Sequence, residues 1–326
     1  MEAMTTSEDL RAIADRYWEA RLEASPLFAT FLGDHRYDDR VDDLSEQGEA
    51  RQRQTWLGFL AEAEAVDPDE LDATDRVTRQ LLVEEIGDAV SSIDARLIEL
   101  TSDQMQGIHA ELLTMAGQLR ASEPEHAAMA VKRVRAMGSM LDQAVERYRA
   151  GLAAGRTPAR TCIDRSINQI DGYLDSPLDQ DPFAHLAGPE DWDGEEAWRA
   201  ELTDAVTTEL RPAFARYRAV LADELAPVAR SDERPGLSWL PEGDDLYRQL
   251  IRLHTGLDLT PEELHEIGMQ EVTEELPAQY RVLGRRAFGT DDLAEIFAHL
   301  LDDTDLRYGS GDEIIEDARR CLDEAS

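Results

Sequence analysis

The chain of 326 residues carries 70 acidic and 33 basic side chains, which gives a formal net charge of −37 at pH 7. This balance argues against nucleic acids and anionic membrane surfaces as partners, because no basic stripe exists to meet phosphates or lipid headgroups. No apolar run approaches the roughly 20 residues that cross a bilayer. The acidic N-terminus also lacks the apolar segment of a signal peptide, so we expect a cytoplasmic protein.

The basic residues are almost all arginine, and Lys132 is the single lysine. A GC-rich genome replaces Lys by Arg, but it does not by itself supply this many carboxylates. Dense carboxylates keep a protein soluble in concentrated salt, where long-range repulsion is screened. The composition therefore favours the hypothesis of a halophilic protein that needs salt to stay compact.

Apolar residues recur at helical spacing in nearly every segment, and no alternating strand pattern stands out. The first helix, about 7–24, carries an apolar stripe of Leu10, Ile13, Tyr17 and Leu22. Further helices are expected at about 26–33, 45–65, 75–97, 101–113, 122–154, 159–174, 195–221, 244–253, 260–272, 289–300 and 310–322. The fold class predicted is all-α, a stack of long antiparallel helices in one continuous domain over residues 1–326.

Several local signals refine this prediction. Ser122 and Glu125 predict a capping box at the start of the longest helix. Pro212 and Pro277 are expected to kink or end the helices in which they occur. The segment 175–194 is rich in Pro, Asp and Gly, so it is the best candidate for a boundary or a surface excursion.

A polar loop, DHRYDDRVDDLS, begins at Asp34 and carries His35, Arg36 and Tyr37 among aspartates. Such a mixture could face a cleft. The other interpretation is structural: Tyr37 anchors the loop, while Arg36 and Arg40 pair with neighbouring aspartates. We favour the structural interpretation, because only a minority of loop positions carry function.

The stretch 234–272 predicts two helices joined by the segment His254–Leu259. Thr260 as N-cap, Pro261 at the first helical position and Glu263 three residues after the cap mark the start of the second helix. This helix contains HEIGM, which resembles the start of a zinc-peptidase helix but has Met269 where the second histidine would stand. His265 is therefore interpreted as an ordinary helix residue.

No other catalytic constellation is visible in the sequence. None of the seven histidines is spaced four residues from another, although convergence of His254 and His265 on a metal stays open. There is no Gly-x-Ser-x-Gly elbow. Cys162 and Cys321 are far apart and are interpreted as free thiols. No catalytic or metal-ligating residue is assigned.

Three segments carry a family resemblance: SPLFATFLGDHRYDDRVDDLS, YRQLIRLHTGLDL and LTPEELHEIGMQEV. They resemble the DUF885 family, in collinear order from about residue 10 to the end, and that family resembles the helical gluzincin metallopeptidases. The resemblance implies a zinc motif, H-E-x-x-P-G-H-H, downstream of the segment matching Leu264–Val272. This chain reaches Ser326 without that motif. We therefore expect the truncated N-terminal half of a zinc peptidase, inactive alone, with zinc only in a full-length relative.

The resemblance also implies that this half forms one wall of a substrate cleft. The candidate peptide contacts are polar residues at predicted helix junctions, namely His35, Arg36, Tyr37, Tyr247 and His254. The expected partners are a peptide substrate or the missing C-terminal half, and an uncovered apolar face would allow self-association. The alternative is a non-enzymatic helical interaction protein that has kept the scaffold.

Overall fold

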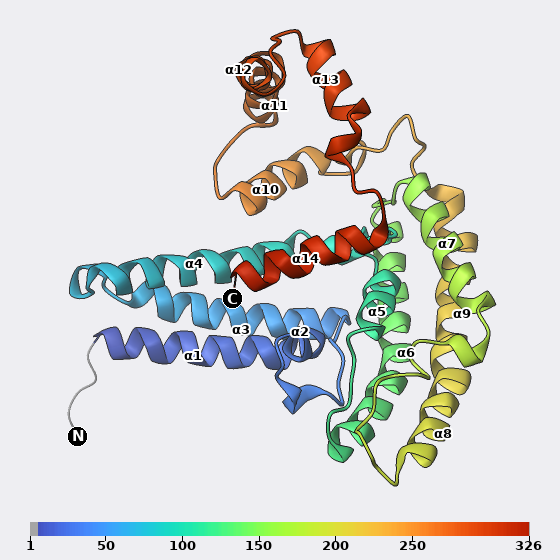
Figure 1. The fold of residues 1–326 in the computed structure, drawn as a ribbon. Coiled ribbons are helices and arrows are strands. Elements are labelled where there is room, and N and C mark those ends of the chain that lie inside the picture. Colours follow the sequence, from blue (N-terminus) through green and yellow to red (C-terminus); the bar gives the residue numbers. More distant parts are fainter. Residues whose placement is uncertain (1–5, 326) are drawn as a thin grey trace. The chain divides into compact units, whose positions relative to one another are not determined.

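The computed structural model describes residues 6–325 and is helical along most of that range (Figure 1). Within it no strand occurs, and extended backbone pairs only at two isolated bridges, Arg120–Ala187 and Ala159–Arg230. The predicted all-α class is therefore confirmed. The fold forms two compact units, Met1–Gly256 and Leu257–Ser326, where the sequence predicted one continuous domain.

The first unit begins with a layer of three long helices, α1 (Thr6–Ala24), α3 (Glu46–Ala65) and α4 (Ala73–Asp94). The predicted stripe of α1 is buried at all four positions, and Tyr17 meets Trp56 of α3 edge to face at 5.2 Å. Ser45 caps α3 by accepting a hydrogen bond from the backbone N–H of Gly48. The short helix α2 (Pro26–Phe31) follows α1.

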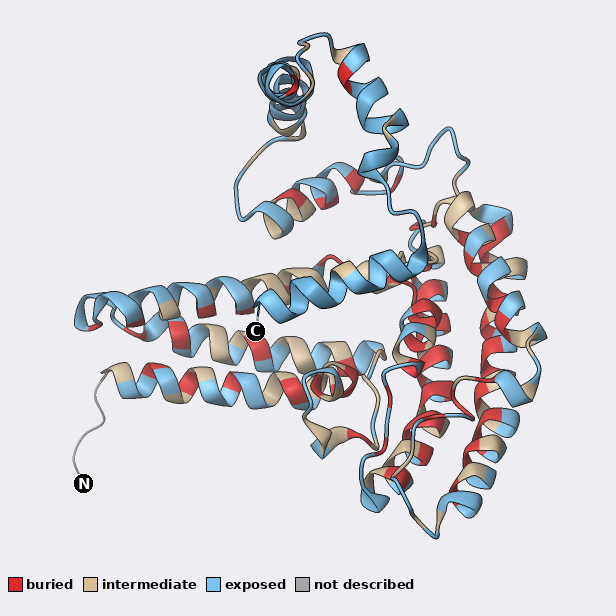
Figure 2. Cartoon of the chain, viewed as in Figure 1, coloured by how far each residue is buried: buried red, intermediate tan, exposed pale blue. Residues whose placement is uncertain are grey.

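The helices α1, α3 and α4 share one hydrophobic core, and a second hydrophobic core lies among the five helices that follow. These are α5 (Ile108–Ala116), α6 (Pro124–Ala153), α7 (Arg160–Asp175), α8 (Glu195–Ala205) and α9 (Arg211–Val220). Figure 2 shows burial concentrated along α6 and its neighbours. Met137 and Met140 are fully buried there, as core residues that fill gaps.

The capping box predicted for α6 does not form. The helix starts at Pro124, with Glu123 as an N-cap that makes no side-chain cap bond. Proline is favoured at the first helical position because its missing N–H needs no partner there. The hydroxyl of Ser122 lies instead 3.2 Å from Nδ1 of His126.

The prolines expected to kink or end helices are accommodated by π-helical turns. The three turns are Val206–Leu210, Leu221–Leu225 and Glu271–Glu275, and they precede Pro212, Pro227 and Pro277. In the first turn, the N–H of Arg211 bonds the carbonyl of Val206, five residues back. A proline clashes with the carbonyl four residues before it and offers no N–H. The wider turn relieves that conflict, so the α-helix continues through Pro212 and Pro277, while a single 3-10 turn, Ala226–Val228, follows the turn before Pro227.

The segment 175–194 is not a plain surface excursion. Phe183 and Leu186 are buried in the second core. Asp181 is fully buried, accepts a hydrogen bond from the backbone N–H of Phe183 at 3.0 Å, and lies 2.9 Å from Nε of Arg211. These contacts pin the segment against α9, and its high Pro, Asp and Gly content reflects tight turns.

The first unit ends with α10 (Gly243–Thr255), which buries Leu246 and Ile251. The amide of Gln249 donates to the carbonyl of Ser91 at 2.8 Å and so joins α10 to α4. Gly256 ends the helix in the left-handed conformation, with a φ of 68°, which favours glycine.

The second unit contains α11 (Pro261–Gln270), α12 (Leu276–Ala287), α13 (Leu293–Asp302) and α14 (Gly311–Ala325). The capping box of Thr260 and Glu263 at the start of α11 is confirmed. Among the described residues of this unit only Gly284 and Ile296 are buried, and Ile296 packs over the glycine. The helices of this unit therefore bury few of their apolar side chains against one another.

Most surface arginines of the first unit pair with carboxylates, for example Arg53 with Asp94 at 2.6 Å and Arg216 with Asp142 at 2.7 Å. Because acids exceed bases by 70 to 33, most carboxylates still lack a cationic partner of their own. Repulsion between these carboxylates is therefore the dominant electrostatic interaction at the surface.

None of the helices within residues 6–325 combines the length and apolarity that crossing a membrane requires.

Dialysis from concentrated to dilute salt is expected to unfold the protein partly. The screening length grows from about 3 Å in molar salt to about 30 Å at about 0.01 M, so carboxylates across the surface begin to repel one another. The measurement is the helical circular dichroism signal and its melting temperature along the salt series. A full and stable helical signal in dilute salt would sink the halophile hypothesis.

Candidate functional site

His35, Arg36 and Tyr37 form a single 3-10 turn after α2. Nδ1 of His35 lies 2.8 Å from Asp38, and its ring stacks on the ring of His126 with centroids 4.8 Å apart. These contacts hold the turn against the start of α6.

The two arginines of this loop are paired. Arg36 donates to Asp34 and Glu19, at 2.6 and 2.7 Å. The guanidiniums of Arg36 and Arg40 lie 5.3 and 5.5 Å from the ring centre of Tyr37. Tyr37 thus lies between two cations that already have carboxylate partners, as Arg40 contacts Glu23 at 3.3 Å. These cation–π and ion-pair contacts fit the structural interpretation of the loop.

Beneath this loop lies Arg133 of α6, whose side chain is 2% exposed. Its guanidinium donates to the carbonyls of Arg40 and Tyr37 at 2.9 and 2.7 Å, and to the hydroxyl of Thr30 at 2.7 Å. It also lies 3.2 Å from the buried carboxylate of Asp38. A single buried arginine therefore fixes the path of the loop, and the sequence analysis did not single it out.

Asp42, in the same loop, is a carboxyl group whose surroundings disfavour its charged form. Burial raises its pKa to about 7, with a further contribution from the charge of Glu111. Because the folded-state pKa lies above the unfolded value, the contribution of Asp42 to stability is fully present below about pH 4. It is lost as the pH rises through about 7.

Replacing Asp42 by Asn is therefore expected to stabilise the protein at pH 8 by on the order of 1–2 kcal/mol, and by much less at pH 5. The measurement is urea unfolding at both pH values in constant salt. Asp39→Asn, at a neighbouring carboxylate that is 32% exposed, is the control and should show no such gain. An equal effect of Asp42→Asn at both pH values would contradict the account.

Tyr247 and His254 lie on α10, and both are exposed, Tyr247 by 43%. No hydrogen bond, ion pair or ring contact within residues 6–325 joins either of them to the His35–Tyr37 turn. The five predicted cleft residues thus form two separate groups. None of the five lines the main cavity of the first unit.

That cavity, with a volume of about 890 Å³, lies where the first half of α3 and the end of α4 meet the second half of α6. Charged side chains of both signs line it from α3, from α6 and from the turn that follows α4. The arginines are Arg53, Arg96, Arg147 and Arg149, and the acids are Glu46, Glu49, Asp94, Glu99 and Glu146. Because the whole chain has a net charge of −37, this nearly equal number of arginines and acids means that arginine is enriched around the cavity.

Glu99 is the centre of a charge cluster in this cavity, with a side chain only 2% exposed. It accepts two hydrogen bonds of 2.7 Å from the guanidinium of Arg96, and Nε of Arg156 lies 3.1 Å away. Arg147 lies 2.5 Å from Glu49 and 3.8 Å from Glu99. Burial raises the pKa of the Glu49 carboxyl and lowers that of the Arg156 guanidinium, so both groups are charged at an energetic cost.

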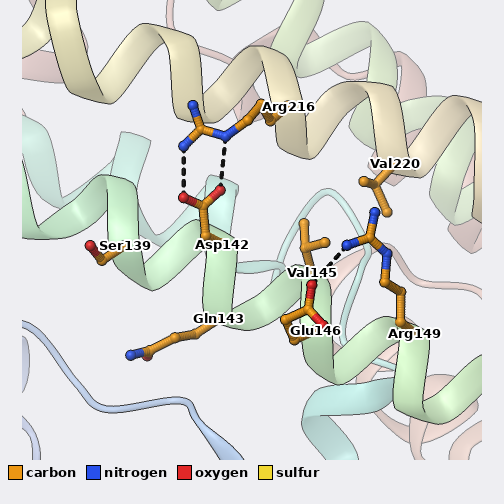
Figure 3. Close-up of a pocket in the computed structure, with 8 residues that line it drawn as sticks. All are labelled: Ser139, Asp142, Gln143, Val145, Glu146, Arg149, Arg216 and Val220. Carbon is orange, nitrogen blue, oxygen red and sulfur yellow. Dashed lines mark hydrogen bonds and ion pairs between the residues drawn. The ribbon is translucent and has the colours of Figure 1, made fainter.

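A second groove, of about 490 Å³, lies on the other side of the same α6 ridge, toward α9 (Figure 3). Figure 3 shows the carboxylate of Asp142 paired with two nitrogens of Arg216, and the distances are 3.1 Å to Nε and 2.7 Å to Nη2. Gln143, Glu146 and Arg149 line both cavities. The polar face of α6 therefore forms a ridge with a cavity on each side.

The sequence matches, over residues 26–326, the family described as bacterial protein of unknown function (DUF885). This chain belongs to the DUF885 family. The family part of the predicted resemblance is thereby confirmed. Its finer parts, the relation to gluzincin peptidases and the truncation, stay predictions.

A solved structure with the same fold is that of a candidate lipoprotein from Colwellia psychrerythraea. It superposes on the DUF885 chain with a TM-score of 0.81 at 16% sequence identity, which shows likeness of fold alone. The match covers 99% of the DUF885 chain but only 59% of the Colwellia chain, so the chain spans less than two thirds of that relative. No curated protein matches the sequence.

A third polar cluster of the DUF885 chain reaches from the buried Tyr148, Tyr217 and His109 in its second core to the exposed Gln169. Tyr148 donates to the carbonyl of Thr101 at 2.7 Å and lies 2.8 Å from the hydroxyl of Tyr217. His109 lies 3.1 Å from Oε1 of Gln169 and 3.4 Å from the Tyr217 hydroxyl. Burial lowers the pKa of His109 to about 4. The ring is neutral and hydrogen-bonded, which fits a structural role.

The potential metal ligands of the DUF885 chain are its His, Cys, Asp and Glu side chains. In the part of the chain that the structure describes, no group of three or more His, Cys, Asp or Glu side chains is arranged to hold a metal ion. A zinc site needs three or four convergent ligands. The side chains described here therefore do not fit the ligand set of zinc.

Proposed function

We propose that this DUF885 chain is the substrate-binding portion of a peptide hydrolase whose reactive groups lie outside residues 1–326. The observation that carries the proposal is the cavity beside α6, whose walls present guanidiniums and carboxylates together. A peptide carries a cationic amine, an anionic carboxylate and neutral amides between them. A cavity of about 890 Å³ with both signs of charge has the size and chemistry to take a short peptide.

Two observations support a need for further polypeptide. The helices of the second unit leave nearly all their apolar side chains uncovered by one another, including Val272, Leu283 and Leu301. The Colwellia structure has the same fold over 99% of this chain and extends well beyond it. In the gluzincin peptidases that the family resembles, zinc activates water for attack on a peptide carbonyl. No residue of this chain is assigned to that step.

The alternative is a non-enzymatic interaction protein built on the same scaffold. The exposed apolar side chains of α11–α14 are the observation that favours it, since such a face suits a protein partner. It differs from the first proposal in one measurable respect, because a pure interaction protein has no need for a cavity that binds small peptides.

The test is calorimetric titration of the chain with a mixture of tripeptides, followed by chromatography of the same peptides. Binding without cleavage is the expected result. Absence of binding would overturn the proposal in favour of the interaction protein. Cleavage by the chain alone, if a substitution in this chain abolished it, would overturn the assignment of the reactive groups to other polypeptide.

A further inference from the structure

We infer that His35 and His126 together bind a divalent transition-metal ion that prefers imidazole ligands, such as Ni²⁺ or Cu²⁺. His35 lies in the 3-10 turn after α2, and His126 lies in the first turn of α6. Their rings stack with centroids 4.8 Å apart and planes 29° apart. Neither histidine lines the cavity beside α6, so the inference goes beyond the proposed function and does not depend on it.

A hydrogen bond prepares His35 to act as a ligand. Its Nδ1 lies 2.8 Å from Oδ2 of Asp38. Because a carboxylate accepts hydrogen bonds and donates none, the neutral ring carries its proton on Nδ1 and leaves a lone pair on Nε2. Histidines that bind metals commonly donate their other ring N–H to a carboxylate in this way, which fixes the orientation of the ring.

His126 is held in a similar manner. Its Nδ1 lies 3.2 Å from the hydroxyl of Ser122, four residues earlier. Within residues 6–325 no hydrogen bond or ion pair reaches Nε2 of either histidine, and neither atom is sealed in the interior. The side chain of His35 is 33% exposed, and His126 is half-buried. Each ring is therefore held through Nδ1 and keeps Nε2 free for an ion from solvent.

The stacked rings lie close enough for one ion to meet a nitrogen from each. An ion about 2.0–2.1 Å from both nitrogens requires them to lie within about 4 Å of each other. Rings with centroids 4.8 Å apart meet this condition when their Nε2 atoms turn toward the same edge, which the broad terminal torsion of histidine permits. No third ligand joins the pair among the described side chains, so water completes the coordination shell.

The binding of such an ion would be linked to folding, because it joins a loop to a helix from a distant part of the sequence. The two imidazoles come together only in the folded chain, so the ion stabilises the folded state by mass action. The net charge of −37 also raises the local concentration of cations around the protein.

The experiment is calorimetric titration of the chain with Ni²⁺ at pH 7.5 in excess Mg²⁺. Mg²⁺ prefers oxygen ligands, so it occupies carboxylates and leaves imidazoles open. All proteins carry Cys321→Ser, because an exposed thiol also binds Ni²⁺. One Ni²⁺ per chain is expected to bind and to raise the melting temperature. His35→Gln and His126→Gln should each weaken this binding at least about tenfold, because each leaves a single imidazole.

The matched control is His185→Gln. His185 is exposed, and its Nδ1 lies 3.0 Å from the backbone carbonyl of Asp181, so this ring too is held through one nitrogen. Among the described residues, the ring contact between His35 and His126 is the single one that joins two histidines. His185→Gln should therefore leave the affinity for Ni²⁺ and the shift in melting temperature unchanged.

If either substitution at the pair prevents folding, as judged by circular dichroism, the same titration at pH 5.5 decides. An ordinary imidazole is mostly protonated there, whereas ordinary carboxylates stay ionised, so a histidine site is lost and a carboxylate site persists. Four results would overturn the inference: Ni²⁺ binding that persists at pH 5.5, binding that survives both substitutions at the pair, an equal loss in His185→Gln, or no binding at all. Each of them leaves the proposed peptide cavity untouched.

Discussion

Arg133→Met is expected to lower the free energy of unfolding by about 3–5 kcal/mol. The substitution leaves the carboxylate of Asp38 buried at 5% exposure without its guanidinium. It also leaves the carbonyls of Tyr37 and Arg40 without the hydrogen bonds that the Arg133 guanidinium donates to them. Methionine keeps most of the apolar contacts of the arginine stem, so the loss reports the polar contacts. Urea unfolding at constant salt, followed by circular dichroism, measures it.

Arg135→Met is the matched control, two residues further along the same helix. Arg135 is 35% exposed and pairs with Asp204 and Glu209, which are themselves 57% and 41% exposed. Surface pairs of this kind contribute about 0–1 kcal/mol. If the two substitutions destabilise equally, the loop that carries His35, Arg36 and Tyr37 is not held in place by Arg133.

His109→Gln is expected to change how stability depends on pH. In the folded protein the pKa of His109 is lowered to about 4 by burial, against about 6.5 in an unfolded chain. A neutral ring is thus favoured by folding. The stability it contributes is fully present above about pH 6.5 and is lost as the pH falls toward 4. That loss is about 3 kcal/mol in the wild type and is absent from the variant.

The measurement is the difference in unfolding free energy between wild type and His109→Gln at pH 7, 5.5 and 4, in constant salt. Carboxylates titrate equally in both proteins, so the difference isolates His109. Tyr217→Phe is the control, because it removes a hydroxyl 3.4 Å from the ring and keeps the ring itself. It should lower stability by about 1–2 kcal/mol at every pH. If the unfolding free energy of His109→Gln fell with pH as steeply as that of the wild type, the attribution of this pH dependence to His109 would be wrong.

Helix positions were predictable because they depend on local periodicity and capping. The stripe of α1 is buried as expected, Ser45 caps α3, and Thr260 forms its box with Glu263. Where two local signals compete, the sequence pattern alone does not decide which of them forms the start of the helix. Pro124 took the first position of α6 and displaced the box expected between Ser122 and Glu125. The π-helical turn before Pro212 also required the structure, since a proline in a helix can end it, bend it or widen it.

The main cavity could not be predicted, because its walls come from three segments that are far apart in sequence. Glu49 and Arg147 each stand in a stretch of charged residues that looks like a solvated surface, while Glu99 stands among apolar residues. One signal was available: Arg147 directly precedes Tyr148 and lies two residues after Val145, two apolar residues of the helix predicted over 122–154. A charged residue so close to buried positions is a candidate for a buried ion pair.

The most direct test of the proposed function is peptide hydrolysis, measured with the chain alone and with the polypeptide encoded from codon 1 through the codons after 326. The account predicts that the chain alone binds peptides and cleaves none, with or without added zinc. The extended polypeptide should cleave them and lose that activity when its zinc motif is substituted. Cleavage by residues 1–326 alone, or a silent extended polypeptide without such a motif, would contradict the account.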